Sequence, residues 1–329
     1  MELKTMLAEL CEADGMGGLD GALLVAEKYL SEICDVNRHA NSLIGVMGEG
    51  DKTVMLEAHI DEIGMMVTSI ENGFLTVAPA GGIDSRMLSG MRVSVHGKQK
   101  VTGVFCSIPP HLRGKESATP KFDDLYIDTG LGDKAAEIIS IGDRVTFKQS
   151  FKELSGSLVT CKSLDNRAGV AAVLLAAEKL SKTSLNKEVV ICLSDMEELG
   201  GMGAKTAGFD INPDEALAVD VSFGNAPDIS EDKTGRLGDG AMIGISPVLS
   251  HSVADRLKSA AKCANESFQI EVMGGKTSTD ADVLALNRGG VECGLLSIPL
   301  RNMHTPVEIV DMKDIESVAN IISQFVLTD

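Results

Sequence analysis

The sequence predicts an α/β fold: a mainly parallel sheet flanked by helices, with an inserted small β-barrel domain. Near both ends of the chain, short apolar runs alternate with amphipathic helical patterns, which is typical of parallel strands joined by helices. Between them, short β-type runs are separated by glycines and helical periodicity is largely absent. We therefore expect a first domain made of residues 1–66 plus 152–329, and an inserted β-rich domain of residues 67–151.

The composition bounds the class of protein. The chain has 329 residues, of which 44% are hydrophobic, so it can build one large α/β domain or two domains. Its formal net charge is −18, and this negative charge would repel a nucleic acid backbone and an anionic membrane surface. We expect neither nucleic acid nor a membrane as a partner.

The cysteines and the N-terminus indicate a cytoplasmic protein. The seven cysteines are odd in number and scattered, and no Cys-x-x-Cys motif occurs. The first ten residues carry acids inside their apolar pattern and lack the basic start of a signal peptide. No run approaches the ~20 apolar residues that a membrane-spanning helix needs.

The first part of the chain predicts two helices and two strands. Residues 1–13 and 19–33 have helical periodicity. Residues 41–46 and 53–58 are apolar runs on either side of a Gly-Glu-Gly-Asp turn, which predicts a hairpin. The second run leads directly into His59.

The α/β alternation returns after the β-rich segment. Residues 232–244 are rich in glycine, and we expect a loop there, beside the site. The expected strands are 158–161, 189–193, 216–221, 268–272 and 294–298, and the expected helices are 166–182, 203–208, 252–264, 279–288 and 314–327.

Polar side chains stand at the ends of five of the expected strands. In open α/β sheets ligands bind outside the carboxyl ends of the strands, so one edge of the sheet would gather these groups. Two imidazoles and several carboxylates suit zinc or a neighbouring divalent ion, and one carboxylate can bridge two ions. The residues concerned are His59, Asp165, Glu197, Glu198, Asp220 and His304.

Two further roles follow from the spacing. Asp61 lies two residues beyond His59 and could accept the second ring N–H of that imidazole, which would fix its tautomer. Glu197 and Glu198 are adjacent, so one can bind a metal while the other acts as a general base. Asp195, in the same acidic run, has no assigned role.

Each residue alone also has a structural interpretation. An Asp just before a helix, such as Asp165, is commonly an N-cap. Glu197 and Glu198 alone would be a solvated loop, and His304 a turn residue. Asp220 fits such an interpretation less well, because a buried strand rarely carries an unpaired carboxylate. The joint pattern favours a metal site.

These motifs resemble those of the M42 peptidases, the glutamyl and deblocking aminopeptidases, some of which carry an endoglucanase label. The similarity covers nearly the whole chain, in order. It is carried by five motifs: Ala58-His-Ile-Asp-Glu-Ile-Gly64, Ser163-Leu-Asp-Asn-Arg-Ala-Gly169, Glu197-Glu-Leu-Gly200, Asp220-Val-Ser and Ser297-Ile-Pro-Leu-Arg-Asn-Met-His-Thr-Pro-Val-Glu308.

The resemblance implies a zinc-peptidase-like catalytic domain with two divalent ions, zinc or cobalt. His59 and Asp220 would hold one ion, Glu198 and His304 the other, with Asp165 bridging and Glu197 as general base. It also implies that the insert makes subunit contacts, and that dimers build a homo-oligomer, a tetrahedral dodecamer.

Two departures from the family pattern are visible. Residues 17–21, Gly-Gly-Leu-Asp-Gly, lack the Ser-Gly-x-Glu pattern common there, and Asn166 replaces an acid often seen beside the bridging Asp. Asn166 is not an expected ligand, so the metal set is unaffected.

The expected activity is removal of N-terminal residues from peptides with a free N-terminus, by metal-activated water with Glu197 as base. Related alternatives are an acylamino-acid deacylase or a carboxypeptidase. A glycosidase is a weaker alternative, because the chain has no Trp to stack on a sugar. The last alternative is a scaffold protein that binds no metal. Arg86 or Arg301 could favour acidic substrates, or pair with a site carboxylate.

Overall fold

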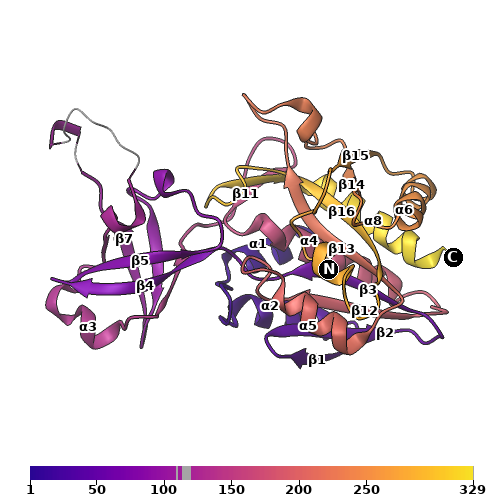
Figure 1. Ribbon diagram of the computed structural model, residues 1–329, viewed down its shortest axis with the longest axis horizontal. Helices are drawn as coiled ribbons and strands as arrows, with labels where there is room; N and C mark the ends of the chain where they lie inside the picture. The colour runs from indigo at the N-terminus through magenta and orange to yellow at the C-terminus, as the bar shows by residue number, and fades with distance from the viewer. Residues whose placement is uncertain (109, 113–119, 329) are drawn as a thin grey trace.

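The computed structural model describes residues 1–108, 110–112 and 120–328 (Figure 1). The chain forms a mixed α/β fold with a large mixed sheet, and a second sheet lies to one side of it (Figure 1). Residues 109 and 113–119 of the expected insert lie outside the described residues.

The large sheet has eleven strands among the described residues. Its main path runs β1-β2-β12-β3-β13-β16-β17-β11-β10, and β14 pairs with both β15 and β16. The strands are β1 (Asp35–His39), β2 (Ser42–Met47), β3 (Thr53–His59), β10 (Lys152–Glu153), β11 (Leu158–Cys161), β12 (Glu188–Ser194), β13 (Glu215–Phe223), β14 (Ala241–Ile245), β15 (Phe268–Val272), β16 (Glu292–Arg301) and β17 (Glu308–Asp311).

The prediction of a mainly parallel sheet was wrong in extent. Only the central strands β12, β3, β13 and β16 are parallel neighbours, together with the pair β14 and β15. The strands toward both ends of the path pair antiparallel. The difference follows burial, because β3 and β12 are buried along nearly their whole length, whereas the edge strand β1 is largely exposed.

The predicted hairpin of β2 and β3 was also wrong. Strand β12 lies between them, antiparallel to β2 and parallel to β3. The expected loop over 232–244 contains the start of β14, where Gly244 packs closely against Leu295. Residues 234–240 are a loop as expected, with Gly238 and Gly240 at positive φ, and only Gly244 serves close strand packing. The expected helix 279–288 is reduced to α7 (Ala281–Leu284).

Helices cover both faces of the large sheet. One apolar core joins α1, α2, α4, α6 and α8 to it, and a smaller one packs α5 and α7 on the other side. No helix in the described ranges combines the length and apolar character needed to cross a membrane. The helices are α1 (Leu3–Glu12), α2 (Gly21–Leu30), α3 (Ala135–Ile138), α4 (Leu164–Leu180), α5 (Met202–Ile211), α6 (His251–Cys263), α7 (Ala281–Leu284) and α8 (Met312–Leu327).

The second sheet has a core of its own, which contains residues from Ile63 to Phe147. Its strand order is β4-β5-β8-β7-β6-β9, and it closes because β9 also pairs with β4. The sheet starts three residues before the expected boundary at residue 67. Its strands are β4 (Gly64–Glu71), β5 (Phe74–Ala80), β6 (Arg92–His96), β7 (Lys100–Phe105), β8 (Ile127–Asp128) and β9 (Arg144–Phe147).

The topology brings five strand ends to one edge of the large sheet. Strands β12, β3, β13 and β16 point the same way. Strand β17 runs opposite to β16 and to β11, so β11 again points in the direction of β16. The segments that follow β3, β11, β12, β13 and β16 therefore leave the sheet on the same side.

A buried ion pair joins two of these strand ends. Glu62 follows β3 and Lys162 follows β11, and the Lys162 Nζ lies 2.9 and 2.7 Å from the two carboxylate oxygens of Glu62. Both side chains are buried. The Gly15 N–H also donates to Glu62, at 2.9 Å, which attaches the N-terminal loop to the same point.

Replacing Lys162 with Met should destabilise the protein by about 3–5 kcal/mol, because Glu62 is then left buried without a cation. The free energy of unfolding would be measured by urea denaturation at one protein concentration. The matched control is Lys182→Met, which removes an exposed pair with Glu178 and should change stability little. Equal small losses in the two variants would contradict the importance of the buried pair.

Candidate metal centre

A cavity of about 500 Å³ lies where the five strand ends meet. Six of the seven predicted site residues line it, and Asp61 is buried beside them. The residues that line the cavity are His59, Asp165, Glu197, Glu198, Asp220 and His304.

The side chains form two groups that could each hold a metal ion. The first group is His59, Asp165 and Asp220, and the second is Asp165, Glu198 and His304. Within each group the possible ligand atoms all lie within 4.8 Å of one another. Asp165 belongs to both groups, so its carboxylate stands between the two positions.

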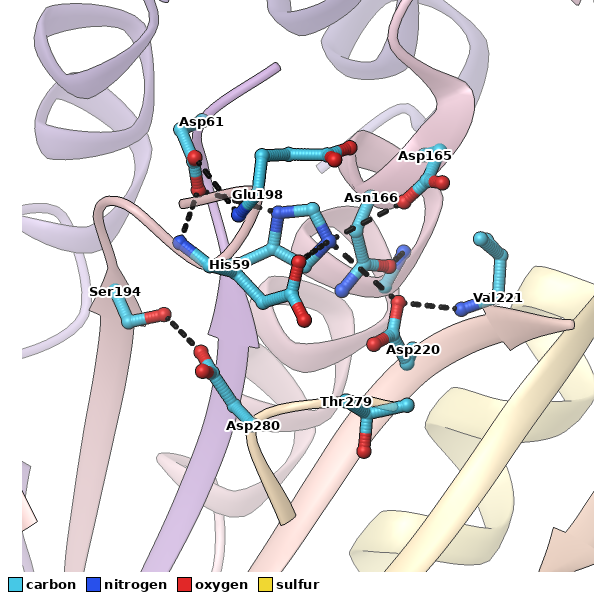
Figure 2. A network of polar contacts seen from close by, with 12 residues as sticks. His59, Asp61, Asp165, Asn166, Ser194, Glu198, Asp220, Val221, Thr279 and Asp280 are labelled. Atoms are coloured by element: carbon cyan, nitrogen blue, oxygen red, sulfur yellow. Dashed lines mark hydrogen bonds and ion pairs between the residues drawn. The ribbon is translucent and has the colours of Figure 1, made fainter. Parts of the chain in front are cut away.

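The contacts of the two imidazoles define this geometry. His59 Nε2 lies 3.2 Å from Asp165 Oδ1 and 3.6 Å from Asp220 Oδ1 (Figure 2). His304 Nε2 lies 3.4 Å from Asp165 Oδ2 and 3.4 Å from Glu198 Oε1. Each imidazole thus faces one oxygen of Asp165 and one further carboxylate.

Asp165 is not the N-cap of α4, although an N-cap was one interpretation of the sequence. Its backbone has non-helical φ and ψ, and its side chain turns toward the imidazoles. The capping bond comes from the next residue instead, because Asn166 Oδ1 accepts the Gly169 N–H at 3.1 Å. Asn166 Nδ2 also donates to the Val219 carbonyl at 2.8 Å, which ties this turn to β13.

Glu308 holds two of the predicted ligands through their backbone N–H groups. One of its carboxylate oxygens accepts the Asp165 N–H at 3.0 Å, and the other accepts the His304 N–H at 2.9 Å. Burial and the nearby Asp165 carboxylate raise the pKa of Glu308. This role was missed from the sequence, where Glu308 was only the last residue of a motif.

The second ring nitrogen of each imidazole has a defined neighbour. His304 Nδ1 lies 2.8 Å from the Gly82 carbonyl oxygen. Because a carbonyl oxygen only accepts, Nδ1 carries the hydrogen and Nε2 can present its lone pair to an ion. His59 Nδ1 lies 3.3 Å from Asp61 Oδ1, without the geometry of a hydrogen bond.

Asp61 also positions the acidic pair. Its Oδ1 accepts the Glu197 N–H at 3.0 Å, and its Oδ2 accepts the Glu198 N–H at 3.2 Å. In Figure 2 the Asp61 carboxylate lies beside the His59 ring, and a dashed line joins it to the backbone nitrogen of Glu198. Its carboxylate therefore fixes the loop after β12 as well as facing the imidazole.

Glu197 belongs to neither ligand group. Its Oε2 lies 4.0 Å from His59 Nε2, and the side chain is partly exposed on the cavity wall. Asp195, which had no assigned role, is buried and accepts the Gly18 N–H at 3.2 Å, so it anchors the N-terminal loop. Burial and Asp61 raise the pKa of Asp195 to about 6.

The charges of the site favour bound cations. Burial raises the pKa of Glu197 to about 9 and that of Glu198 to about 8, and nearby carboxylates contribute to both shifts. Burial also raises the pKa of Asp220. Carboxylates packed this closely are stable in their ionised form only with positive charge between them. A donor set of imidazoles and carboxylates fits divalent metal ions.

A second buried carboxylate pair lies beneath the site. The Ser194 Oγ is 2.7 Å from Asp280 Oδ2 (Figure 2). It is also 2.8 Å from Glu57 Oε1, and all three side chains are buried. Burial and Asp280 raise the pKa of Glu57 well above its usual range. The sequence holds a signal for this pair, since Glu57 is a carboxylate inside a buried strand.

The two arginines considered for substrate selection do not line the cavity. Arg86 pairs with Asp84 and is largely exposed. Arg301 donates to the Asn225 backbone carbonyl at 2.5 Å and to its side-chain oxygen at 2.9 Å. Neither arginine pairs with a site carboxylate among the described residues.

Comparison with known proteins indicates the same family as the sequence motifs. The model of the M42 glutamyl aminopeptidase family matches residues 41–321. A putative aminopeptidase of Acetivibrio thermocellus is 32% identical, with 98% of each chain covered.

Two solved structures are also similar. The aminopeptidase APDkam598 of Desulfurococcus kamchatkensis has a TM-score of 0.92 and 30% identity, and the match covers 98% of this chain and 94% of that one. The TET1 peptidase of Pyrococcus horikoshii has a TM-score of 0.88 and 30% identity over 98% of each chain, and it assembles into a tetrahedron or an octahedral shell. The chain therefore belongs to the M42 family of peptidases and is a hydrolase.

Proposed function

We propose that the protein is a dinuclear metal-dependent aminopeptidase that removes N-terminal residues from peptides. The observation that carries this proposal is the pair of ligand groups that share Asp165. His59 and Asp220 would hold one divalent ion, and Glu198 and His304 the other. When bound, two such ions supply Lewis-acid polarisation of the scissile carbonyl and stabilise its developing negative charge.

Glu197 is the general base in this proposal. It lines the cavity, belongs to neither ligand group, and has its backbone held by Asp61. It takes a proton from the attacking water and returns it to the leaving amine. Asp61 is a positioning residue, because it holds the loop that carries Glu197 and faces the His59 ring.

The lining of the cavity supports a substrate with a free amino group. Five acidic side chains line it, and none of the described lining residues is a lysine or an arginine. A carboxypeptidase must bind a C-terminal carboxylate, for which this lining offers no cationic side chain. The cationic α-amino group of a peptide fits the same surroundings.

Three further properties remain proposals. We propose a division into a catalytic domain, 1–66 plus 152–329, and an inserted domain, 67–151, which the separate apolar core of the second sheet supports. We propose a homo-oligomer, built from dimers up to a dodecamer, by analogy with the tetrahedral assembly of the Pyrococcus horikoshii relative. We propose the cytoplasm as its location, on the scattered, unpaired cysteines.

The variant Glu197→Gln should keep two metal ions per subunit while kcat falls by about 10²- to 10⁴-fold, because the proton acceptor is lost and the ligands remain. Metal content would be measured by elemental mass spectrometry, and kcat with aminoacyl-amide substrates. Glu32→Gln, on an exposed turn, is the control. A kcat close to that of the wild type would show that Glu197 is not the base.

Removal of the shared carboxylate should affect both metal positions. Asp165→Asn should lower the content of both ions, whereas Asp220→Asn should lower it by about one ion per subunit, because Asp220 belongs to one group only. The measurement is metal content after dialysis against zinc or cobalt. Equal losses in the two variants would contradict the bridging role of Asp165.

Chelation of the wild type should abolish hydrolysis, and either metal should restore it.

A free N-terminus should be required. The protein should hydrolyse unblocked peptides and leave their N-acetylated counterparts intact, because acetylation removes the positive charge that the acidic cavity favours. The two forms of one peptide would be compared by mass spectrometry of the products. Preferred cleavage of the acetylated form would favour the acylamino-acid deacylase.

A further inference from the structure

One carboxylate on the cavity wall has no part in the proposed reaction. Glu271, on β15, lines the cavity but belongs to neither ligand group. Ser222 donates a hydrogen bond to one of its oxygens, and Ser297 donates to the other at 3.3 Å. These bonds hold the carboxylate in place against the ends of β13 and β16.

Glu271 has no cationic partner. No described ion pair includes it, and the cavity lining that the structure describes contains no lysine or arginine. Burial raises the pKa of its carboxyl group. The ionised form would therefore gain from a cation that enters the cavity.

The bound ions of the proposed mechanism do not supply that cation. The ligand groups that would hold the ions contain Asp165, Glu198 and Asp220, and Glu197 serves as the general base. Among the described lining carboxylates, Glu271 alone has neither of these roles.

Glu271 lies close to the predicted ligand Asp220. Asp220 and Ser222 are two residues apart on β13, so they point to the same side of the strand, about 7 Å apart along it. Ser297 is the register partner of Asp220 on β16. Because Glu271 contacts both serines, it lies next to the metal position that Asp220 would help to form.

Part of the surrounding wall is apolar. Phe223, Met273, Leu295 and Met303 line the same cavity as Glu271. A lysine side chain combines an apolar stem with a terminal ammonium group, and arginine is similar in both respects. Such a side chain can place its stem against these walls and its charge against the carboxylate.

We propose that Glu271 selects peptides whose N-terminal residue is lysine or arginine. The inference rests on the proposed aminopeptidase function and adds the substrate class of that site. An N-terminal glutamate is disfavoured, because its carboxylate would meet that of Glu271. Glu271 acts here as a specificity residue and takes no part in bond cleavage.

The sharpest test compares lysine with norleucine, which has the same stem and lacks the ammonium group. The zinc- or cobalt-loaded protein would be assayed with fluorogenic amides of lysine, arginine, norleucine, leucine and glutamate. We expect kcat/KM for lysine to exceed that for norleucine on the order of tenfold to a hundredfold, as for a hydrogen bond to a charged group. Glutamate should be the poorest substrate.

The variant Glu271→Gln should remove the preference for the lysine amide over the norleucine amide, mainly by raising KM for the lysine amide. The rate with the norleucine amide should stay nearly unchanged. Glu271→Asp should restore part of it, and Glu32→Gln should have the wild-type preference. Equal rates for lysine and norleucine, or a preference that persists in Glu271→Gln, would overturn the assignment of Glu271 and leave the aminopeptidase function intact. Failure to hydrolyse any of the amides would contradict the proposed function itself, and the inference with it.

Discussion

The position of Asp165 between two imidazoles is the constraint on which the site depends. Its two oxygens face His59, at the end of β3, and His304, in the turn after β16, which are far apart in the sequence. Burial raises the pKa of Asp165, but the imidazoles of His304 and His59, in their protonated form, lower it below its usual value. A carboxylate that stays ionised at this point can attract positive charge from both sides.

Much of the surrounding structure serves to hold that carboxylate in place. Glu308 binds the backbone N–H of Asp165 and of His304, so one buried side chain sets the spacing between them. Asn166 caps α4 and binds β13, which leaves Asp165 free of helix capping. Gly169 is needed in this turn, since a Cβ there would meet Asn166 Oδ1 at 2.2 Å.

The sequence was sufficient to predict which polar groups lie together in one cavity. Polar residues at the ends of apolar strands, such as His59 and Asp220, are recognisable because the local pattern changes abruptly from buried to charged. Their convergence then follows from the direction of the strands, and the structure brings them to one cavity. The antiparallel strand β17 between β16 and β11 does not disturb this, because a second reversal restores the direction.

Strand neighbours and supporting contacts could not be predicted in the same way. The position of β12 between β2 and β3 depends on contacts about 140 residues apart, and the local glycine turn favoured a hairpin instead. The bonds from Glu308 and from Asp61 to backbone N–H groups leave no mark in a sequence pattern. Such contacts depend on how loops approach one another after the strands are in place.

The second sheet contacts the site through a backbone group in the part of the chain that the structure describes. The Gly82 carbonyl, in the segment after β5, accepts from His304 Nδ1 and so directs Nε2 toward Asp165 and Glu198. A Cβ at residue 82 would lie 2.7 Å from His304 Nδ1, so only glycine lets the carbonyl approach this closely. A shift of the second sheet relative to the large sheet would change this contact. The orientation of one predicted ligand, and with it the second metal position, therefore depends on how the two sheets pack against each other.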